Sequence, residues 1–271
     1  MTDPGWVSFL PPDLWAEEMK SSLSGLTGRE ILLIPLTKST NTLARELAHE
    51  GCPEGTVVMA NDQTEGRGRH GRRWIAPQGK NISMSIVLYP ALPFREAGLL
   101  TLMSAVACAS ALRGLSVPAS IKWPNDIMIS GKKIGGILTE LRAEGERIIH
   151  AIMGIGINVN ILADEMPEEI RETATSLAIE TGTGVNRTDL SVRILREIDS
   201  WYERLLREGS APVREEWLRL SSTIGKTVKV TMPAETITGK ATGIDETGML
   251  LLSLSDGSER VINSGDLTMV R

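Results

Sequence analysis

Hydrophobic residues follow two different periods along the chain, and the changes between them divide it into strands and helices. The stretch 81–89 alternates between apolar and polar positions, which predicts a half-buried strand. Residues 190–205 instead repeat every three or four positions, which predicts an amphipathic helix that ends at Gly209. The same criteria predict further strands over 31–36, 56–63, 119–123, 127–129, 134–141 and 147–158, and further helices over 14–23, 96–115 and 212–220.

The pattern changes after Gly225, where the apolar runs become shorter and are joined by Asp-Glu-Thr-Gly and Asp-Gly turns. This pattern predicts a small β-barrel-like domain. Its predicted strands are 226–232, 236–244, 249–254 and 260–262. The expected organisation is an N-terminal extension over 1–29, a main domain over 30–223 and a C-terminal domain over 224–271.

Polar side chains begin one more predicted helix. Ser39, Thr40 and Asn41 precede apolar positions at helical spacing, and Gly51 follows the last turn. Hydroxyl and amide side chains cap the free N–H groups at a helix start, and glycine commonly ends a helix. The same side chains and N–H groups also suit a polar ligand. The sequence leaves both interpretations open.

An arginine loop over 65–74 carries four arginines and three glycines before it ends at Trp74. Arginine binds carboxylate and phosphate through a planar, permanently charged fork, and glycine lets backbone bend or approach a ligand. The loop therefore indicates an anion-binding site, with a solvated tether as the alternative. Residues 66–71 also match a Gly-x-Gly-x-x-Gly spacing, but no helix opens directly after the glycines, so a dinucleotide-binding fold is excluded.

Composition narrows the class of protein. The chain has 271 residues, is 41% hydrophobic and 23% charged, and carries a net charge of −5, which argues against a dedicated nucleic-acid-binding protein. The arginine loop is therefore a local feature with a local ligand. Cys52 and Cys108 form no disulfide framework and the three histidines lack metal-ligand spacing, so we expect a cytoplasmic protein. The uncharged run 97–112 is short for a membrane span and predicts a buried helix.

Three further polar clusters fall at the ends of predicted strands. They are Lys-Trp-Pro-Asn-Asp over 122–126, Lys133 followed by Gly135 and Gly136, and Gly-Ile-Gly-Ile-Asn-Val-Asn over 154–160. Each has a plain structural explanation on its own, because strand ends are often rich in glycine and asparagine. Jointly they indicate one site.

These motifs, in this order and spacing, resemble those of biotin protein ligases. The resemblance rests on five segments and covers about residues 30–271: Ser39–Asn41, Gly66–Trp74, Lys122–Asp126, Lys132–Glu140 and Gly156–Asn160. It implies an α/β fold of the α+β kind, with a mixed, largely antiparallel sheet flanked by helices and a small SH3-like β-barrel at the C-terminus. The chain resembles the short form of the family, which lacks an N-terminal DNA-binding module, so no DNA binding is expected.

The resemblance also implies an activity. Biotin and ATP would give biotinyl-5′-AMP and pyrophosphate, and a lysine of a biotin carboxyl carrier protein, a carboxylase subunit, would then take the biotin. Mg²⁺ is expected with the ATP phosphates, and its protein ligands are unknown, with Asp126 as the nearest candidate. No membrane association is expected, and a homodimer is an expectation of the family alone.

The resemblance gives each matching residue a role. Hydrogen bonds to the ureido head of biotin are expected from Ser39, Thr40, Asn41 and Gln63. The loop that closes over the valerate chain and the phosphate is expected to use Gly66, Arg67, Gly68 and Arg69. Lys133, with Gly136 behind it, is expected to bind the biotin carboxylate and the α-phosphate.

The remaining roles concern ATP and catalysis. Contacts to ATP are expected from Arg69, Arg72, Trp74, Lys122, Asn125, Asp126, Lys133 and Asn158, with Trp74 and Asn158 near the adenine. The expected catalytic residues are Lys133, Asp126 and Arg69. Asp126 would orient either the acceptor lysine or the metal, and Lys122 would pair with Asp126 or a phosphate.

Two other functions compete with this one. A lipoate–protein ligase has a related fold, but the Gly-Arg-Gly-Arg and Lys-Trp-Pro-Asn-Asp patterns favour biotin. A non-enzymatic, DNA-binding biotin sensor is disfavoured by the acidic net charge and by the absence of a predicted helix-turn-helix.

Overall fold

The computed structural model describes residues 14–270, most of which build around one seven-stranded sheet with the strand order β1-β2-β3-β7-β6-β5-β4. β1 and β2 are parallel, and every other neighbouring pair is antiparallel. The mixed, largely antiparallel sheet implied by the sequence is confirmed. The strands are β1 (Ile31–Thr37), β2 (Val57–Gln63), β3 (Asn81–Leu88), β4 (Ser120–Lys122), β5 (Asp126–Ile129), β6 (Lys132–Glu144) and β7 (Arg147–Asn158).

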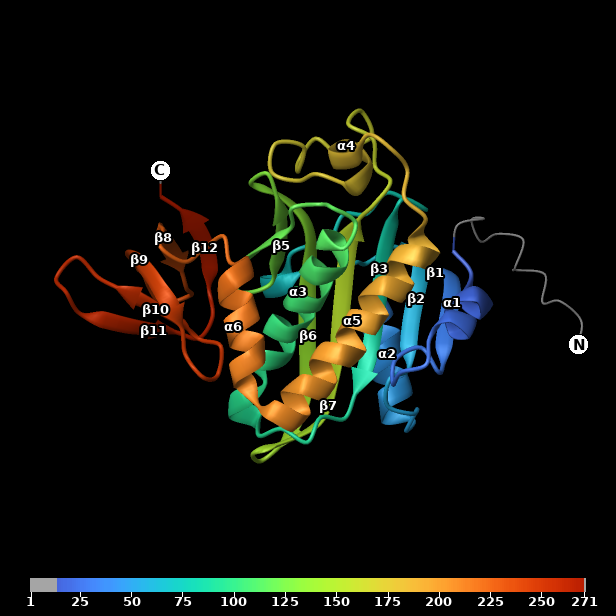
Figure 1. Cartoon of the computed structure of the whole chain (residues 1–271), viewed down its shortest axis with the longest axis horizontal. Coiled ribbons are helices and arrows are strands. Elements are labelled where there is room, and N and C mark those ends of the chain that lie inside the picture. Colours follow the sequence, from blue (N-terminus) through green and yellow to red (C-terminus); the bar gives the residue numbers. More distant parts are fainter. Residues whose placement is uncertain (1–13, 271) are drawn as a thin grey trace, which may run out of the picture.

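Helices cover both faces of this sheet, and the alternation of side chains along the strands decides which residues meet which helices. On β2, Val57 and Met59 join the main core, whereas Val58 between them packs in a second cluster with Ala44 and Ala48 of α2. Figure 1 shows α3, α5 and α6 lying across the face of the main core. The helices are α1 (Ala16–Ser22), α2 (Thr40–His49), α3 (Gly98–Arg113), α4 (Leu177–Thr181), α5 (Arg187–Glu208) and α6 (Ser210–Leu220).

The apolar run that contains α3 is a core element, as its sequence predicts. By length and composition alone, Phe94–Arg113 would be long and apolar enough to cross a membrane, but 67% of its most apolar window is buried inside the protein. Alanine and serine on α3 let it lie close to the sheet and to α5 and α6. The prediction of a buried helix is confirmed.

The first described residues belong to the same core. The short helix predicted over 14–23 is confirmed as α1, and Leu14 and Met19 are almost completely buried in the main cluster. The backbone N–H of Thr27 donates to the Asp199 carboxylate of α5 at 2.8 Å. This segment is therefore held against α5.

The C-terminal part folds as a separate five-stranded antiparallel sheet beside α6, in the order β11-β10-β9-β8-β12 (Figure 1). The indole nitrogen of Trp123 donates to the Gly248 carbonyl, which ties this sheet to the turn that precedes β5. The last strand, β12, was not predicted from the sequence. The strands are β8 (Thr227–Thr231), β9 (Thr236–Ile244), β10 (Leu250–Ser253), β11 (Glu259–Ile262) and β12 (Asp266–Met269).

Candidate active site

A cavity of about 290 Å³ lies where the start of α2, the strands β6 and β7, the arginine loop and the edge of the C-terminal domain meet. All five motif segments found in the sequence contribute to its walls. Six cationic side chains and two carboxylates are among its lining residues, so the cavity is strongly positive in an acidic protein. The charged lining residues are Arg67, Arg69, Arg72, Arg73, Lys122, Asp126, Lys133 and Asp266.

The floor of the cavity exists because β7 carries glycine where its side chains would point into it. Ile152 packs with α2, so the residues two and four positions further along β7, Gly154 and Gly156, share that face. A Cβ atom at Gly156 would lie 2.6 Å from the Trp74 ring, and one at Gly154 would collide with the Asn41 amide. Neither glycine was assigned a role from the sequence, although the Gly-x-Gly spacing on a strand is a usable signal.

At one end of the cavity, neutral polar groups form a compact network. Gln63 Oε1 accepts hydrogen bonds from the Thr40 backbone N–H at 2.8 Å and from its hydroxyl at 3.2 Å. The Ser85 hydroxyl, fully buried on β3, lies 2.7 Å from Thr40 Oγ1 and 2.6 Å from Asn41 Oδ1. The Ser39 side chain also lines the cavity and is almost fully buried. Such a group of hydroxyls and amides suits an uncharged polar ligand.

The capping interpretation of this helix start is wrong for Ser39. Ser39 occupies the N-cap position of α2, but its side chain makes no capping hydrogen bond. Thr40 and Asn41 are instead engaged with β2, β3 and β6. The polar residues at the start of α2 therefore line the cavity rather than close the helix end.

The arginine loop forms a small hairpin over the cavity. The backbones of Arg67 and Arg73 form an isolated antiparallel β-bridge. The Gly68 N–H donates to the Arg72 carbonyl at 2.7 Å, and the Trp74 N–H donates to the Gly66 carbonyl at 2.9 Å. The tip is a short 3₁₀ turn over Arg69–Gly71. Gly66 holds the base of the hairpin and is not among the lining residues, whereas Arg67, Gly68, Arg69 and Arg72 line the cavity.

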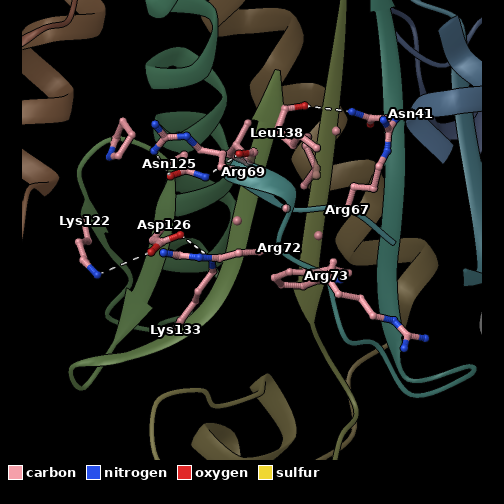
Figure 2. Close-up of a pocket in the computed structure, with 18 of the residues that line it drawn as sticks. Asn41, Arg67, Arg69, Arg72, Arg73, Lys122, Asn125, Asp126, Lys133 and Leu138 are labelled. Atoms are coloured by element: carbon pink, nitrogen blue, oxygen red, sulfur yellow. Dashed lines mark hydrogen bonds and ion pairs between the residues drawn. The ribbon is translucent and has the colours of Figure 1, made fainter. Parts of the chain in front are cut away.

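Two lysines hold the carboxylate of Asp126 at the other end of the cavity. Lys133 Nζ lies 2.6 Å from Asp126 Oδ1, and Lys122 Nζ lies 3.8 Å from Asp126 Oδ2 (Figure 2). Gly136, three residues after Lys133 on β6, leaves room for the ion pair of Lys133 with Asp126, since a Cβ atom there would lie 3.1 Å from Lys133 Nζ. The predicted pairing of Lys122 with Asp126 is confirmed.

Arg69 reaches from the loop tip to the same end of the cavity. Its Nη1 donates to Asn125 Oδ1 at 3.2 Å (Figure 2). Burial lowers the pKa of the Arg69 guanidinium and the neighbouring charge of Arg72 lowers it too, while Asp266 and Asp126 raise it. Arg72 forms an ion pair with Asp266 on β12. Arg73 extends away from the other labelled side chains and donates to the Thr64 carbonyl (Figure 2).

Two buried polar atoms near Gly156 have no hydrogen-bond partner, one on Trp74 in the cavity wall and one on Asn158 behind it. Trp74 Nε1 is buried and unpaired, and Lys133 Nζ lies 5.7 Å from the centre of the Trp74 ring. Asn158 lies outside the lining residues and donates from Nδ2 to the Thr175 carbonyl at 3.0 Å, which leaves its buried Oδ1 without a partner. Buried polar atoms are nearly always paired. Among residues 14–270, Asn81, Arg214 and Trp217 also carry unpaired buried nitrogens, and of all five residues only Trp74 lines the cavity, which makes its Nε1 a candidate donor to a ligand.

Three polar contributors were missed by the sequence reasoning. Glu140 was read as part of a motif but received no role, although its Oε2 accepts from Asn41 at 2.8 Å and from Arg67 at 3.0 Å. Ser85 sits on a strand whose alternation marks it only as facing away from the main core. Asp266 lies on an unpredicted strand of the other domain. None of the three has a local signal that reveals its partner.

Known proteins resemble this chain over nearly its whole length. Residues 33–158 match the model of the biotin/lipoate A/B protein ligase family, and residues 223–267 match that of the biotin protein ligase C terminal domain. The chain is 37% identical over 256 residues to the bifunctional ligase/repressor BirA of Bacillus spizizenii, which covers 94% of this chain and 79% of that protein. It is 31% identical to the biotin–[acetyl-CoA-carboxylase] ligase of Mycobacterium tuberculosis, covering 97% of this chain and 98% of that one.

The fold agrees with these matches. The structure of the biotin protein ligase from Aquifex aeolicus in complex with biotin and ATP superimposes with a TM-score of 0.77 at 30% identity, over 90% of this chain and 99% of that one. The sequence identity, both domain matches and the shared architecture agree, and the chain belongs to the biotin protein ligase family.

Proposed function

We propose that this biotin ligase forms biotinyl-5′-AMP in the cavity described above and passes the biotin to a lysine of a biotin carboxyl carrier protein. A single observation carries the assignment to this site. One cavity joins an uncharged, hydrogen-bonding end at Thr40, Asn41 and Gln63 to a cationic end at Lys133 and Arg69. Biotin has the same division, with a neutral ureido head and a carboxylate at the end of its valerate chain.

At the neutral end, Ser39, Thr40, Asn41 and Gln63 bind the ureido head in this proposal. The Gln63 amide nitrogen stays available for the ureido oxygen, because the Gln63 oxygen is already engaged by Thr40. Gly154 on the sheet floor supports this end indirectly, because the absence of a side chain there leaves room for the Asn41 amide. Arg67 and Gly68 then close the loop over the valerate chain.

At the charged end, Lys133 receives the biotin carboxylate and the α-phosphate. A carboxylate oxygen attacks the α-phosphorus and pyrophosphate leaves, so two negatively charged groups must meet in the transition state. Lys133, Arg69 and Arg72 offset this repulsion in a site whose cations are already in position. Charge-assisted hydrogen bonds contribute about 1.5–3 kcal/mol each, so two or three account for much of the adenylate binding.

The second half-reaction uses the same site. The acceptor lysine attacks the acyl carbon, AMP leaves, and the amine loses a proton. Asp126 lies between two lysines, so an incoming amine that displaces one of them meets a carboxylate ready to orient it. Asn125 supports this step by holding Arg69 through its side-chain oxygen.

Trp74 and Asn158 are assigned to the adenine ring. Their unpaired Nε1 and Oδ1 atoms supply one donor and one acceptor, which match the ring nitrogens and the exocyclic amine of adenine. Lys122, next to Asp126, is assigned to the nucleotide phosphates.

Mg²⁺ fits this site as an ion brought by ATP. No group of three metal-ligating side chains occurs within residues 14–270, and the lining carboxylates Asp126 and Asp266 are both paired with cations. Mg²⁺ bound to nucleotides usually needs only one or two protein carboxylates, with phosphates and water as its other ligands. Such an ion would neutralise charge on the departing pyrophosphate. A cytoplasmic location, a homodimer and the absence of DNA binding stay predictions.

Biotin-dependent exchange of labelled pyrophosphate into ATP, followed by transfer to a carrier protein, tests the proposal directly. Thermal shifts with biotin or lipoate, each with ATP, separate the two ligase types. Stabilisation by biotin is expected, and stabilisation by lipoate alone would refute the assignment.

A further inference from the structure

Glu140 stands where α2, β6 and the arginine loop converge, yet it has no part in the roles assigned above. Its Oε2 accepts from Asn41 Nδ2 at 2.8 Å and from Arg67 Nη2 at 3.0 Å, and its Oε1 lies 3.8 Å from Arg45 Nη1. The carboxylate of Glu140 thus contacts Asn41 at the neutral end of the cavity, Arg67 of the arginine loop and Arg45 on α2.

The contacts fix both partners of Glu140. The two hydrogens of Asn41 Nδ2 go to Glu140 and to the Leu138 carbonyl, so Asn41 Oδ1 faces Ser85 as an acceptor. Arg67 donates from the same Nη2 to Glu140 and to Thr42 Oγ1 at 3.2 Å, which docks the loop on both α2 and β6. Figure 2 shows Asn41 and Arg67 side by side at this end of the cavity.

Position along the chain links this docking to the reacting atoms. Arg67 is two residues before Arg69, and the loop between them is held by the hairpin pairing of Arg67 with Arg73. The position at which the Arg67 side chain is docked therefore determines how far the Arg69 side chain extends into the cavity. Glu140 itself is not among the residues lining the cavity, so any influence on ligand acts through Asn41 and Arg67.

We propose that Glu140 is a positioning residue. It couples the binding of the biotin head at the neutral end of the cavity to closure of the arginine loop. Asn41 and Arg67 donate to the same oxygen of its carboxylate, so a ligand that holds Asn41 in place also holds the acceptor atom to which Arg67 binds. This coupling retains the activated adenylate until the carrier arrives. The inference rests on the function proposed above.

Glu140→Gln tests the coupling, because it keeps the size of the side chain and removes the charge. Preformed biotinyl-5′-AMP is expected to leave the variant about tenfold faster than the wild type, with more labelling of bystander lysines, while the rate of pyrophosphate exchange at saturating biotin changes less than twofold. Glu144→Gln, an exposed change on the same strand where Glu144 pairs with Arg142, is the matched control. Adenylate release at the wild-type rate in Glu140→Gln would overturn the proposal.

A double-mutant cycle separates coupling from a general loss of structure. If Glu140 acts through Arg67, Glu140→Gln combined with Arg67→Ala releases adenylate no faster than the faster single variant, whereas additive effects would contradict the proposal. Glu140→Asp keeps the charge and is expected to release adenylate more slowly than Glu140→Gln. It also serves if the glutamine variant folds poorly. Absence of biotin-dependent exchange in the wild type would refute the proposed function, and this result differs from every outcome of the cycle.

Discussion

Two adjacent lysines at the start of β6 show how strongly function depends on a single side chain. Lys132 is exposed, whereas Lys133 lines the cavity and lies 2.6 Å from Asp126. Removing a preorganised group that stabilises developing charge typically costs about 100-fold in rate or more. Lys133→Ala is therefore expected to lose about 100-fold in biotin-dependent pyrophosphate exchange. Lys132→Ala is the matched control, and equal exchange rates in the two variants would contradict the role of Lys133.

Arg69 is predicted to retain the intermediate in addition to offsetting negative charge while the intermediate forms. Burial lowers the pKa of the Arg69 guanidinium, the charges of Asp266 and Asp126 raise it, and its Nη1 donates to Asn125 Oδ1. Arg69→Ala should still form biotinyl-5′-AMP but release it at least tenfold faster, since a charge-assisted contact to the phosphate is lost. Biotin appearing on bystander proteins measures the release. Retention equal to that of the wild type would refute the role.

Residue types and the family resemblance predicted most of the charged residues that the structure brings together in the cavity, and their roles stay predictions. Arginine, lysine and aspartate at strand ends and in a glycine-rich loop carry their own chemical meaning, so Lys133, Asp126 and Arg69 were identifiable from the sequence. Ser85 and Glu140 were not, because a serine or glutamate on a strand is common and their roles come from partners 44 to 99 positions away. Only tertiary contact gives these two residues a function.

At the scale of elements, the close approach of Trp74 to Gly156 on β7 leads to a prediction about ATP binding. Gly156→Ala places a methyl group 2.6 Å from the Trp74 ring, so the ring must move. If Trp74 contacts adenine, the KM for ATP should rise about tenfold while the KM for biotin changes little. Gly184→Ala is the control, because its added Cβ would have no atom closer than 3.9 Å. Equal rises in both KM values would show a general distortion instead.

The contact between α2 and β7 also predicts a pH dependence of stability. His150 on β7 is 3% exposed, and its ring centre lies 5.2 Å from that of His49 on α2. Burial lowers the pKa of His150, and the charges of His49, Arg142 and Arg45 lower it further. The folded state thus favours neutral His150, and stability falls as the pH drops below about 6.5, where the unfolded chain gains a proton more readily.

Urea unfolding at pH 7.5 and 5.5 measures this effect. The wild type should lose more stability between these two values than His150→Asn, in which the titrating group is absent. Equal losses in the two proteins would contradict the assignment. Carboxylates also titrate toward the acid end, and they contribute alike to both proteins.

Periodicity predicted the long elements of the fold well and the short ones poorly. The alternation of β3 and the helical repeat of α5 are strong local signals, and they located both elements. The prediction that β3 is half-buried is wrong, because every residue of Asn81–Leu88 is buried and α2 packs against the more polar face. The four-residue strand β12 and the five-residue helix α4 have no such repeat, and neither was predicted. The sequence also left open which face of the sheet α2 would cover, because the alternation along β3 does not show that α2 buries the face that carries Ser83 and Ser85. The packing of α2 against β2, β3 and β7 brings its polar first residues to the cavity.

At the scale of the whole molecule, the site joins parts of the chain that are far apart in sequence. Ser39 and Asp266 line the same cavity, although Ser39 precedes α2 in the main domain and Asp266 lies on β12 of the C-terminal sheet. The C-terminal domain therefore does more than stabilise the fold. Through Asp266 it contacts Arg72 of the arginine loop, and through Gly248 it holds the indole of Trp123, next to Pro124 and Asn125.

The ion pair between Asp266 and Arg72 predicts that the C-terminal domain tunes the handling of ATP. Asp266→Asn keeps the side-chain size and removes the charge that orients Arg72. Because the pair is partly exposed, its contribution is small, and the KM for ATP should rise about fivefold at most. The KM for biotin should stay unchanged, since the neutral end of the cavity is built by α2, β2 and β3. Glu259→Gln, an exposed change on β11 in the same domain, is the control. A wild-type KM for ATP in Asp266→Asn would show that Arg72 finds the phosphates without help, and that the two domains meet at this cavity without acting on each other.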